Sequence, residues 1–155
     1  MKSNFLRRFR RTPVQTFILS PLAVLGFELV RRGGGIRFMP LGVLLLGWGY
    51  LQYRLVGRYR LRLGSGGPGM AAPPRRLVTQ GPYAYCRNPM YLGHLVFMFG
   101  LALTFSSVFA LLLFALRAAW FQYRVVGDEA RLAAQFGGDY RAYRARVRRW
   151  IPWVM

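Results

Sequence analysis

Two short segments of the chain carry residue types that could do chemistry. The first, GPYAYCRNPMYLGH (residues 81–94), combines three tyrosines, an arginine, an Asn-Pro pair and the one histidine of the chain. The second places Arg117, Arg124 and Asp128 at spacings of seven and four, with Glu129 directly after. Positions spaced this way lie on one face of a helix, so the second segment predicts two arginines beside two carboxylates.

The Asn-Pro pair allows a structural and a functional interpretation. Pro89 suits the first position of a helix and Asn88 is a favourable N-cap, so the pair could simply start a helix. A capped helix end also presents free N–H groups that suit a carboxylate or phosphate. Arg87 adds positive charge, and Tyr83, Tyr85 and Tyr91 add flat surfaces for an aromatic ring. The functional interpretation is a ligand with a carboxylate at one end and a base at the other.

The charged residues of the second segment also have two interpretations. Arg124, Asp128 and Glu129 could form an interfacial charge cluster, or an anion-binding arginine beside carboxylates that hold a cationic group. Arg117 lies near the middle of an apolar run, where a charge needs a partner or a wet cavity. His94 is expected to have a structural role, with contact to a substrate as the alternative.

Composition limits the class of protein. The chain has 155 residues, is 54% hydrophobic and carries a formal net charge of +19. Long apolar runs with basic flanks are typical of a membrane protein and argue against a nucleic-acid binder. One cysteine, Cys86, excludes an intramolecular disulfide, and one histidine with four acidic residues leaves no set of metal ligands. Among these acids, Glu28 is expected to form a local ion pair with Arg31 and Arg32.

Four apolar runs must position these groups. Each is about long enough to cross a bilayer as a helix, and the last two are joined by Ser106-Ser107 into a hairpin. We therefore expect an all-α integral membrane protein with about four spans, at residues 13–30, 38–56, 90–105 and 108–126. The basic segments place both termini and the 57–89 loop in the cytoplasm, most simply at the cell inner membrane.

The C-terminal region has a different pattern. Apolar residues recur at helical spacing between arginines, with a break expected at Gly137-Gly138, which predicts cationic amphipathic helices at the membrane surface. Trp150 and Trp153 have the character of interfacial anchors. We expect residues 1–57 to form an N-terminal membrane part and residues 58–155 a catalytic half. The apolar face consists of Leu132, Phe136, Tyr140, Tyr143 and Val147.

Two blocks of sequence resemble a known family. LVTQGPYAYCRNPMYLG, an apolar hairpin, and then DEARLAAQFGGDYRAYRARVRRWIP are similar in order and spacing to the isoprenylcysteine carboxyl methyltransferase and phospholipid methyltransferase superfamily. The resemblance covers about residues 75–152 and implies S-adenosylmethionine as cofactor. Arg124 would hold the substrate and act in catalysis with Glu129, and Arg117 and His94 are further candidates for the acceptor. The cofactor contacts implied are Arg75, Arg76, Leu77, Val78, Tyr83, Asn88, Pro89, Met90, Tyr91, Asp128 and Glu129.

The chain departs from the family pattern at two positions. Asn88 replaces the histidine of the family's Arg-His-Pro motif, and Asp128 replaces the first glutamate of its acidic pair. Asparagine keeps hydrogen-bonding groups but does not titrate near neutral pH. A role of that histidine in proton chemistry would therefore be lost, whereas a contact with the cofactor could be kept.

The resemblance leaves the acceptor and two other functions open. The acceptor could be a lipid-like or isoprenoid carboxylate, amine or thiol. The alternatives are a non-enzymatic membrane protein that keeps the fold, and a protein similar to the nicotinamide-dependent sterol reductases, although those are much longer. Gly93 and Gly100 indicate close helix packing, either with the fourth span or with another subunit of a homo-oligomer.

Overall fold

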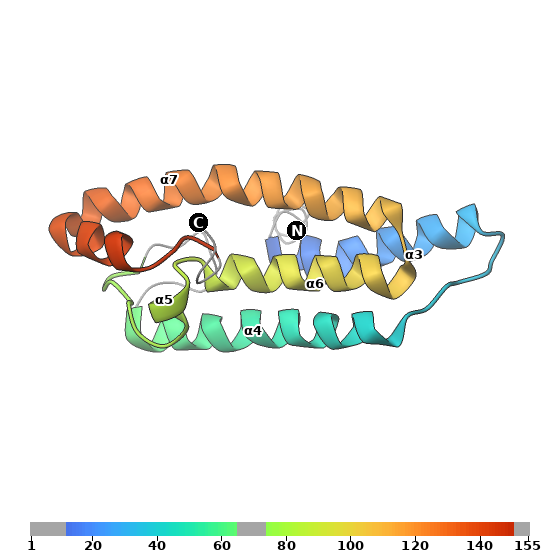
Figure 1. Ribbon diagram of the computed structural model, residues 1–155, viewed down its shortest axis with the longest axis horizontal. Coiled ribbons are helices and arrows are strands. Elements are labelled where there is room, and N and C mark those ends of the chain that lie inside the picture. The colour runs from blue at the N-terminus through green and yellow to red at the C-terminus, as the bar shows by residue number, and fades with distance from the viewer. Residues whose placement is uncertain (1–11, 65–73, 151–155) are drawn as a thin grey trace, which may run out of the picture. The chain divides into compact units, whose positions relative to one another are not determined.

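The computed structural model describes residues 12–64 and 74–150, and all regular structure in these residues is helical (Figure 1). This agrees with the all-α class expected from the sequence. The elements are α2 (Thr12–Val14), η1 (Gln15–Leu19), α3 (Ser20–Arg31), α4 (Pro40–Gly64), α5 (Pro82–Tyr85), α6 (Pro89–Phe105) and α7 (Val108–Arg146).

The first apolar run folds as an uninterrupted helical stretch from α2 to α3. Its middle is η1, a π-helical turn that the hydrophobic pattern gives no sign of. The Ser20 hydroxyl donates a hydrogen bond of 2.8 Å to the Gln15 carbonyl, which helps to satisfy the widened turn. The stretch ends before Gly33 and Gly34, which have φ values of 60° and 93°. These left-handed conformations favour glycine and turn the chain out of the helix.

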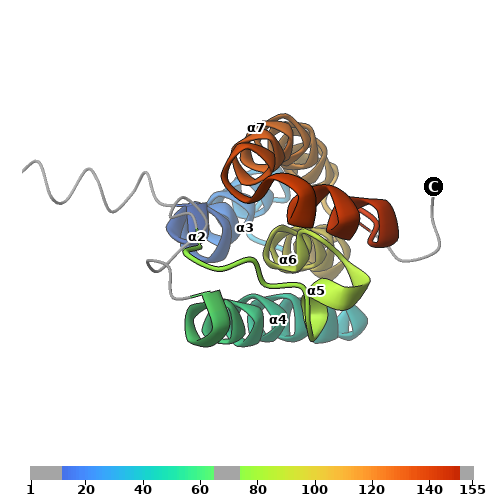
Figure 2. The ribbon, with the colours of Figure 1, turned by 90° about the vertical axis from the view of Figure 1, so that its left-hand side faces the viewer.

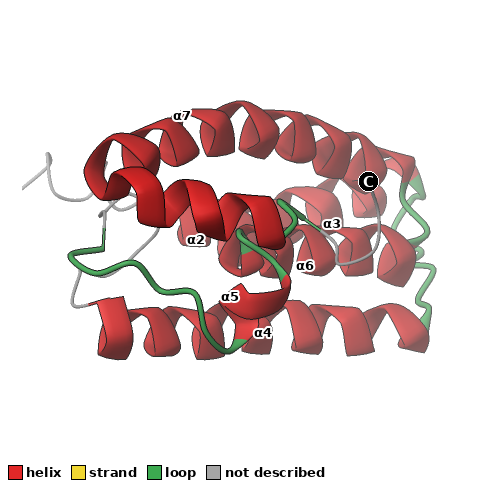
Figure 3. Ribbon diagram, turned by 60° about the vertical axis from the view of Figure 1, so that its left-hand side comes forward, coloured by secondary structure: helices red, strands yellow, loops and turns green. Residues whose placement is uncertain are grey.

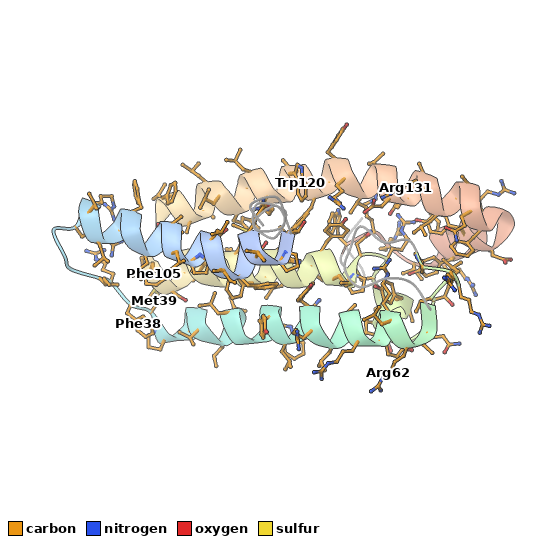
Figure 4. The ribbon with its side chains drawn as sticks, turned by 180° about the vertical axis from the view of Figure 1, so that it is seen from behind. Phe38, Met39, Arg62, Phe105, Trp120 and Arg131 are labelled. Carbon is orange, nitrogen blue, oxygen red and sulfur yellow. The ribbon has the colours of Figure 1, made fainter. Side chains whose placement is uncertain are left out.

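The second apolar run becomes a longer helix than expected. We expected a span that ends at Val56 and a loop from residue 57, but α4 continues to Gly64. Arginine and leucine are good helix formers, so the helix continues after the apolar pattern stops. Figure 4 shows Arg62 pointing away from this part of α4.

The expected hairpin of α6 and α7 is present. Ser106 forms the turn with a φ of 45°, and the Ser107 hydroxyl accepts a 3.1 Å hydrogen bond from the Ala110 N–H, an N-cap contact for α7. The helix that begins with the fourth apolar run does not end at Val126, because α7 continues to Arg146. Its helical geometry breaks at Gly137, which has a φ of 53°, so the break expected at the Gly-Gly pair is confirmed.

Two compact units make up the chain, and α4, α6 and α7 each pass from one unit into the other. The first unit comprises Met1–Tyr50 and Gly93–Ala118, and the second comprises Leu51–Leu92 and Ala119–Met155. This division reflects only which residues pack together. It does not test the expected N-terminal and catalytic halves, which stay a prediction.

In the first unit, α4 and α6 approach closely. A Cβ at Gly42 would clash with the Thr104 backbone, and a Cβ at Gly49 would clash with the Phe97 backbone. The Met39 N–H donates a 2.8 Å hydrogen bond to the Thr104 carbonyl. Figure 4 shows Phe38, Met39 and Phe105 gathered at this end of the two helices. Small residues therefore allow the two backbones to meet closely.

Two helical stretches of the described residues are long and apolar enough to cross a membrane. They are Thr12–Arg31 and Val108–Arg146, which contain 18-residue stretches with mean hydropathies of 1.5 and 1.4. Pro89–Phe105 is apolar but shorter. The structure thus supports a membrane protein, and the number of four spans stays a prediction.

Candidate functional site

A pocket lies within the second unit. Its wall comes from the end of α4, from the segment that leads through α5 into the start of α6, and from α7 on both sides of Gly137. Figure 2 shows the α5 segment between α4 and the C-terminal part of the chain. The lining residues are Arg60, Pro74, Leu77, Val78, Tyr83, Arg87, Asn88, Met90, Tyr91, Asp128, Glu129, Arg131, Leu132, Tyr140 and Tyr143.

The segment before α6 is shaped by a glycine and by the short helix α5. Gly81 has a φ of 57°, and a Cβ at this position would lie 2.6 Å from the Tyr59 ring. Only glycine combines this backbone conformation with so close an approach. The chain then enters α5, becomes extended at Cys86 and starts α6 at Pro89, as the Asn-Pro pair predicts.

The first carboxylate of the pocket is held by a tyrosine and two arginines. The Tyr91 hydroxyl donates a hydrogen bond of 2.6 Å to Asp128 and accepts one of 2.9 Å from Arg124 Nε. Arg131 pairs with the other oxygen of Asp128. The Arg124 guanidinium lies 3.9 Å from Asp128 and 5.3 Å from the centre of the Trp120 ring. Arg124 is thus joined to the pocket wall through Tyr91.

The second carboxylate is gripped by two other arginines. Glu129 is only 5% exposed, and it lies 3.2 Å from an Arg87 nitrogen and 2.9 Å from an Arg149 nitrogen. The Asn88 side-chain amide donates to Glu129 at 3.5 Å and to the Arg149 carbonyl at 3.2 Å. The hydrogen bond to Glu129 raises the pKa of Arg149, so this guanidinium stays charged.

The C-terminal segment closes one side of the pocket. The Tyr143 hydroxyl donates a 2.7 Å hydrogen bond to the Tyr83 carbonyl, and Tyr140 and Tyr143 are 1% and 3% exposed. Burial raises the pKa of Tyr83 to about 12, and burial together with the charge of Glu129 raises the pKa of Tyr140 to about 12. These phenols are therefore neutral at physiological pH and provide ring surfaces and hydroxyl groups.

The buried tyrosines show what the apolar face of the amphipathic C-terminal region covers. Cationic amphipathic helices were expected at the membrane surface, and the two tyrosines of their apolar face pack inside the second unit. Exposed arginines such as Arg141, Arg144 and Arg148 form the outer face. A membrane surface would therefore meet the charged face. Trp150 donates a 2.8 Å hydrogen bond to Gln122, and Trp153 lies outside the described residues.

Cys86 lies directly under this segment. Its thiol is 3.5 Å from the Arg149 carbonyl, and the residue is 4% exposed. Burial raises the pKa of the thiol to about 11. This environment indicates a structural role for Cys86, because a buried neutral thiol is a poor nucleophile.

The structure brings together most of the cofactor-binding residues implied by the resemblance. Of the remaining ones, Pro89 is buried at the start of α6, whereas Arg75 and Arg76 are exposed and bind the Gly64 carbonyl through their backbone N–H groups. The predicted residues that line the pocket are Leu77, Val78, Tyr83, Asn88, Met90, Tyr91, Asp128 and Glu129.

Two predicted substrate contacts belong to the first unit. Arg117 donates a 3.1 Å hydrogen bond to the Gln15 side chain, so this arginine within a span has found a polar neighbour. His94 is fully buried and stacks on Phe17, with 4.7 Å between the ring centres. The expected pair of Arg117 and Arg124 is thus divided between the two units, and a contact of either predicted residue with an acceptor stays a prediction.

Sequence reasoning missed several residues of the wall. Arg60 and Pro74 come from the expected loop, where no pattern marked them. Tyr140 and Tyr143 were recognised as one apolar face, but the surface that the face covers could not be read. Arg149 does not line the pocket but pairs with Glu129, and in its run of arginines only the fold distinguishes it from its neighbours.

The pocket fits a cofactor with a flat base, a carboxylate and a cationic centre. Aromatic and aliphatic side chains can hold the base, and Asp128 and Glu129 can offset the positive charge. Arg87 has an 8% exposed side chain, and its Nε has no hydrogen-bond partner among the residues the structure describes. A buried donor of this kind usually has a partner, and a ligand carboxylate would supply one.

Comparisons with known proteins point to one family. A model of the phospholipid methyltransferase family matches residues 30–138. Protein-S-isoprenylcysteine O-methyltransferase of Schizosaccharomyces pombe is 38% identical over 80 residues, which are 50% of this chain and 34% of that protein. The mouse enzyme of the same name is 32% identical over 79 residues, which are 50% of this chain and 28% of that protein. The chain thus spans about a third of the length of these relatives.

A third relative matches along most of the chain. The cobalt-zinc-cadmium resistance protein CzcN of Cupriavidus metallidurans is 31% identical over 152 residues, which are 96% of this chain and 66% of that protein. In residues 12–64 and 74–150, no three His, Cys, Asp or Glu side chains gather as a metal site would require. No solved structure matches the chain.

Proposed function

Because the chain belongs to the phospholipid methyltransferase family, we propose that it is an S-adenosylmethionine-dependent membrane methyltransferase with a lipid-like or isoprenoid acceptor. The observation that carries this proposal is the pocket of the second unit. Its lining joins apolar and aromatic side chains to two carboxylates and three arginines. Each part of the cofactor therefore has a suitable partner in one wall.

The residues of the pocket have separate tasks. When bound, the cofactor supplies an electrophilic methyl group, which passes from its sulfonium sulfur to a nucleophilic atom of the acceptor and leaves a neutral thioether. Asp128 and Glu129 lower the energy of the cation in the site, and Arg87 offers its Nε to a carboxylate. The tyrosines of the C-terminal segment exclude water, so positioning and electrostatics provide the catalysis.

We infer that the acceptor atom is an oxygen or sulfur anion. An amine must lose a proton before it can be methylated, and the candidate bases are Asp128, Glu129 and His94. Asp128 is engaged by Tyr91 and by arginine, and Glu129 is engaged by two arginines. His94 is fully buried in the first unit. A carboxylate or thiolate needs no base, and Arg124 offers it a positive charge.

We also propose that the pocket faces the cytoplasm at the inner membrane. The basic N-terminal segment and the arginine-rich second unit support this orientation through the positive-inside rule. A soluble cofactor would then reach the pocket from the water, while a lipid-like acceptor would approach from the bilayer. Residues 58–155 would act as the catalytic half in this arrangement.

Cofactor titration of the detergent-purified protein tests the main proposal. S-adenosylmethionine and its demethylated product should each bind with at least micromolar affinity, about −8 kcal/mol. Calorimetry measures both, with NADPH as the control ligand. Heat with NADPH alone would move the protein to the reductase class, and no heat with any of the three would favour a non-enzymatic protein.

A labelled-methyl assay tests the class of acceptor. Purified protein would be supplied with the labelled cofactor and either a farnesylated cysteine with a free carboxylate, a long-chain thiol or phosphatidylethanolamine. We expect label in one of the first two acceptors. Label in phosphatidylethanolamine alone would show that an amine is the acceptor and that one of the engaged carboxylates is released during turnover.

A further inference from the structure

Arg149 contacts two residues of the candidate cofactor site at once. Its guanidinium donates to both oxygens of Glu129, at 3.2 and 2.9 Å, and its main-chain carbonyl accepts the 3.2 Å hydrogen bond from Asn88. The residue does not line the pocket itself, and it lies outside the range 30–138 matched by the family model. Its position is therefore that of a residue behind the wall which fixes two members of the wall.

The segment that carries Arg149 is fastened at several points. After the break at Gly137 the last part of α7 turns back beside the part that precedes the break, as the red segment of Figure 1 shows. Figure 3 shows the same segment running over the loop that carries α5. The Arg87 N–H donates to the Arg148 carbonyl at 2.9 Å, and the Arg87 side chain donates to the Arg144 carbonyl at 3.1 Å.

Most of these fastenings share a property that the Arg149–Glu129 pair lacks. They are hydrogen bonds to main-chain carbonyls, which a residue with any side chain would provide. The ion pair depends on one side chain, and its two ends lie 20 residues apart on opposite sides of Gly137. Among the described residues, this pair is therefore the one side-chain ion pair that joins the returning segment to the part of α7 before Gly137.

We propose that Arg149 is a positioning residue of the cofactor site, whose grip on Glu129 keeps the C-terminal segment closed over the pocket and holds Asn88 and Glu129 in place for the cofactor. The inference rests on the proposed function for the identity of the cofactor. The closure of the C-terminal segment does not depend on the proposed function, because it also buries Cys86 and can be measured without any ligand.

Three variants separate this role from a general effect of charge or stability. Arg149→Ala removes the grip, and Arg149→Lys keeps the charge but loses the two-pronged contact. Arg148→Ala removes an identical charge from the neighbouring exposed position and leaves its carbonyl in place for Arg87. Each variant would be purified as the full chain, and its thermal unfolding would be recorded first.

Two measurements then report on the segment and on the site. Cys86 is the one cysteine of the chain and touches the Arg149 carbonyl, so its rate of alkylation by iodoacetamide measures opening of the segment. Calorimetry measures the affinity for S-adenosylmethionine. For Arg149→Ala we expect alkylation about tenfold faster and affinity about tenfold weaker, with Arg149→Lys between this variant and the parent. Arg148→Ala should match the parent in both.

The outcomes that overturn the inference differ from those that overturn the proposed function. If the parent binds S-adenosylmethionine and Arg149→Ala equals Arg148→Ala in both measurements, Arg149 has no positioning role. Faster alkylation with unchanged affinity also overturns the inference, since Arg149 would then hold the segment without shaping the site. If the parent does not bind this cofactor, the proposed function fails. If Arg149→Ala is then also alkylated at the same rate as the parent, Arg149 does not keep the C-terminal segment closed, and the inference fails as well.

Discussion

Each unit of the molecule contains a buried glutamate held by two arginines and a third polar group. Glu28 in the first unit is 1% exposed and pairs with Arg31 at 2.8 Å and with Arg32 at 2.6 Å. The Ser107 hydroxyl donates the third hydrogen bond, also at 2.6 Å. Glu129 in the second unit has Arg87, Arg149 and Asn88 in the corresponding roles.

The two clusters differ in what surrounds them. Arg32 also donates to the carbonyls of Phe105 and Ser106, so the Glu28 cluster ties the end of α3 to the turn between α6 and α7. Among the described residues each cluster has one buried arginine nitrogen without a hydrogen-bond partner, at Arg32 and at Arg87. Glu129 differs in that it lines a pocket together with a second carboxylate. A buried ion cluster alone is thus weak evidence of a site. The adjoining pocket makes the difference.

The largest effect that would sharpen this comparison is on stability, at Glu28. Glu28→Ala leaves two arginines and a serine without their shared acceptor, and removal of one member of a buried ion pair costs about 3–5 kcal/mol. Denaturant unfolding in detergent measures the loss. Asp139→Ala, which removes an exposed acid, is the matched control. Weakened cofactor affinity in the folded fraction of Glu28→Ala would break the comparison, because Glu28 would then contribute to a site.

The next effect is on turnover, at Arg124. Arg124→Ala should lower turnover about a hundredfold, because a charged hydrogen-bonding partner in a desolvated site contributes about 2–5 kcal/mol. The affinity for S-adenosylmethionine should change little. Steady-state methyl transfer and calorimetry measure the two quantities, and exposed Arg141→Ala is the control. Equal turnover of both variants would reduce Arg124 to a surface charge.

The comparison also shows which contacts a sequence can reveal. The ion pairs of Glu28 with Arg31 and Arg32 are predicted by spacings of three and four on one helix, and the structure confirms them. The partners of Glu129 are 42 and 20 positions away in the chain, and no local rule connects them. Ser107 was seen only as part of a turn, although it also completes the Glu28 cluster from 79 positions away.

The same limit applies to the elements. The apolar runs predict the helices, the hairpin and the break at the Gly-Gly pair, because each depends on local residues. They do not predict the end of α4, since arginines continue a helix beyond the apolar pattern. The resemblance supplies most of the residues that line the pocket. The tyrosines that cover it depend on the direction in which the chain returns after Gly137.

A smaller effect is expected at that return. Gly137 has a φ of 53° and a ψ of −119°, a conformation that costs other residues about 1–3 kcal/mol. Gly137→Ala should therefore lower stability and speed the alkylation of Cys86. Gly138 has no such conformation and open space around it, so Gly138→Ala should be neutral or stabilising by up to about 1 kcal/mol. Unfolding measurements on both variants test whether the return of the chain requires glycine at position 137. Equal losses of stability in the two variants would argue against this requirement.

The smallest effect concerns the third partner of each glutamate. Ser107→Ala removes the hydroxyl that donates to Glu28 and caps α7, so it should cost about 1 kcal/mol of stability and leave cofactor affinity unchanged. Asn88→Ala removes only the longer contacts of 3.5 and 3.2 Å to Glu129 and to the Arg149 carbonyl. We expect it to change stability less than Ser107→Ala does and to weaken cofactor binding severalfold, because Asn88 lines the pocket.

Thermal unfolding and calorimetry on the same preparations compare these two variants. The opposite assignment of losses would mean that the Glu28 cluster belongs to a binding site and that Asn88 is only a helix cap. Asn88→His tests the departure from the family motif in the same assay. If the family histidine serves only as a cofactor contact, this variant should bind the cofactor as the parent does. Turnover that rises with pH through the histidine pKa in Asn88→His, and is flat in the parent, would show instead that the motif carries a proton and that Asn88 has given up that role.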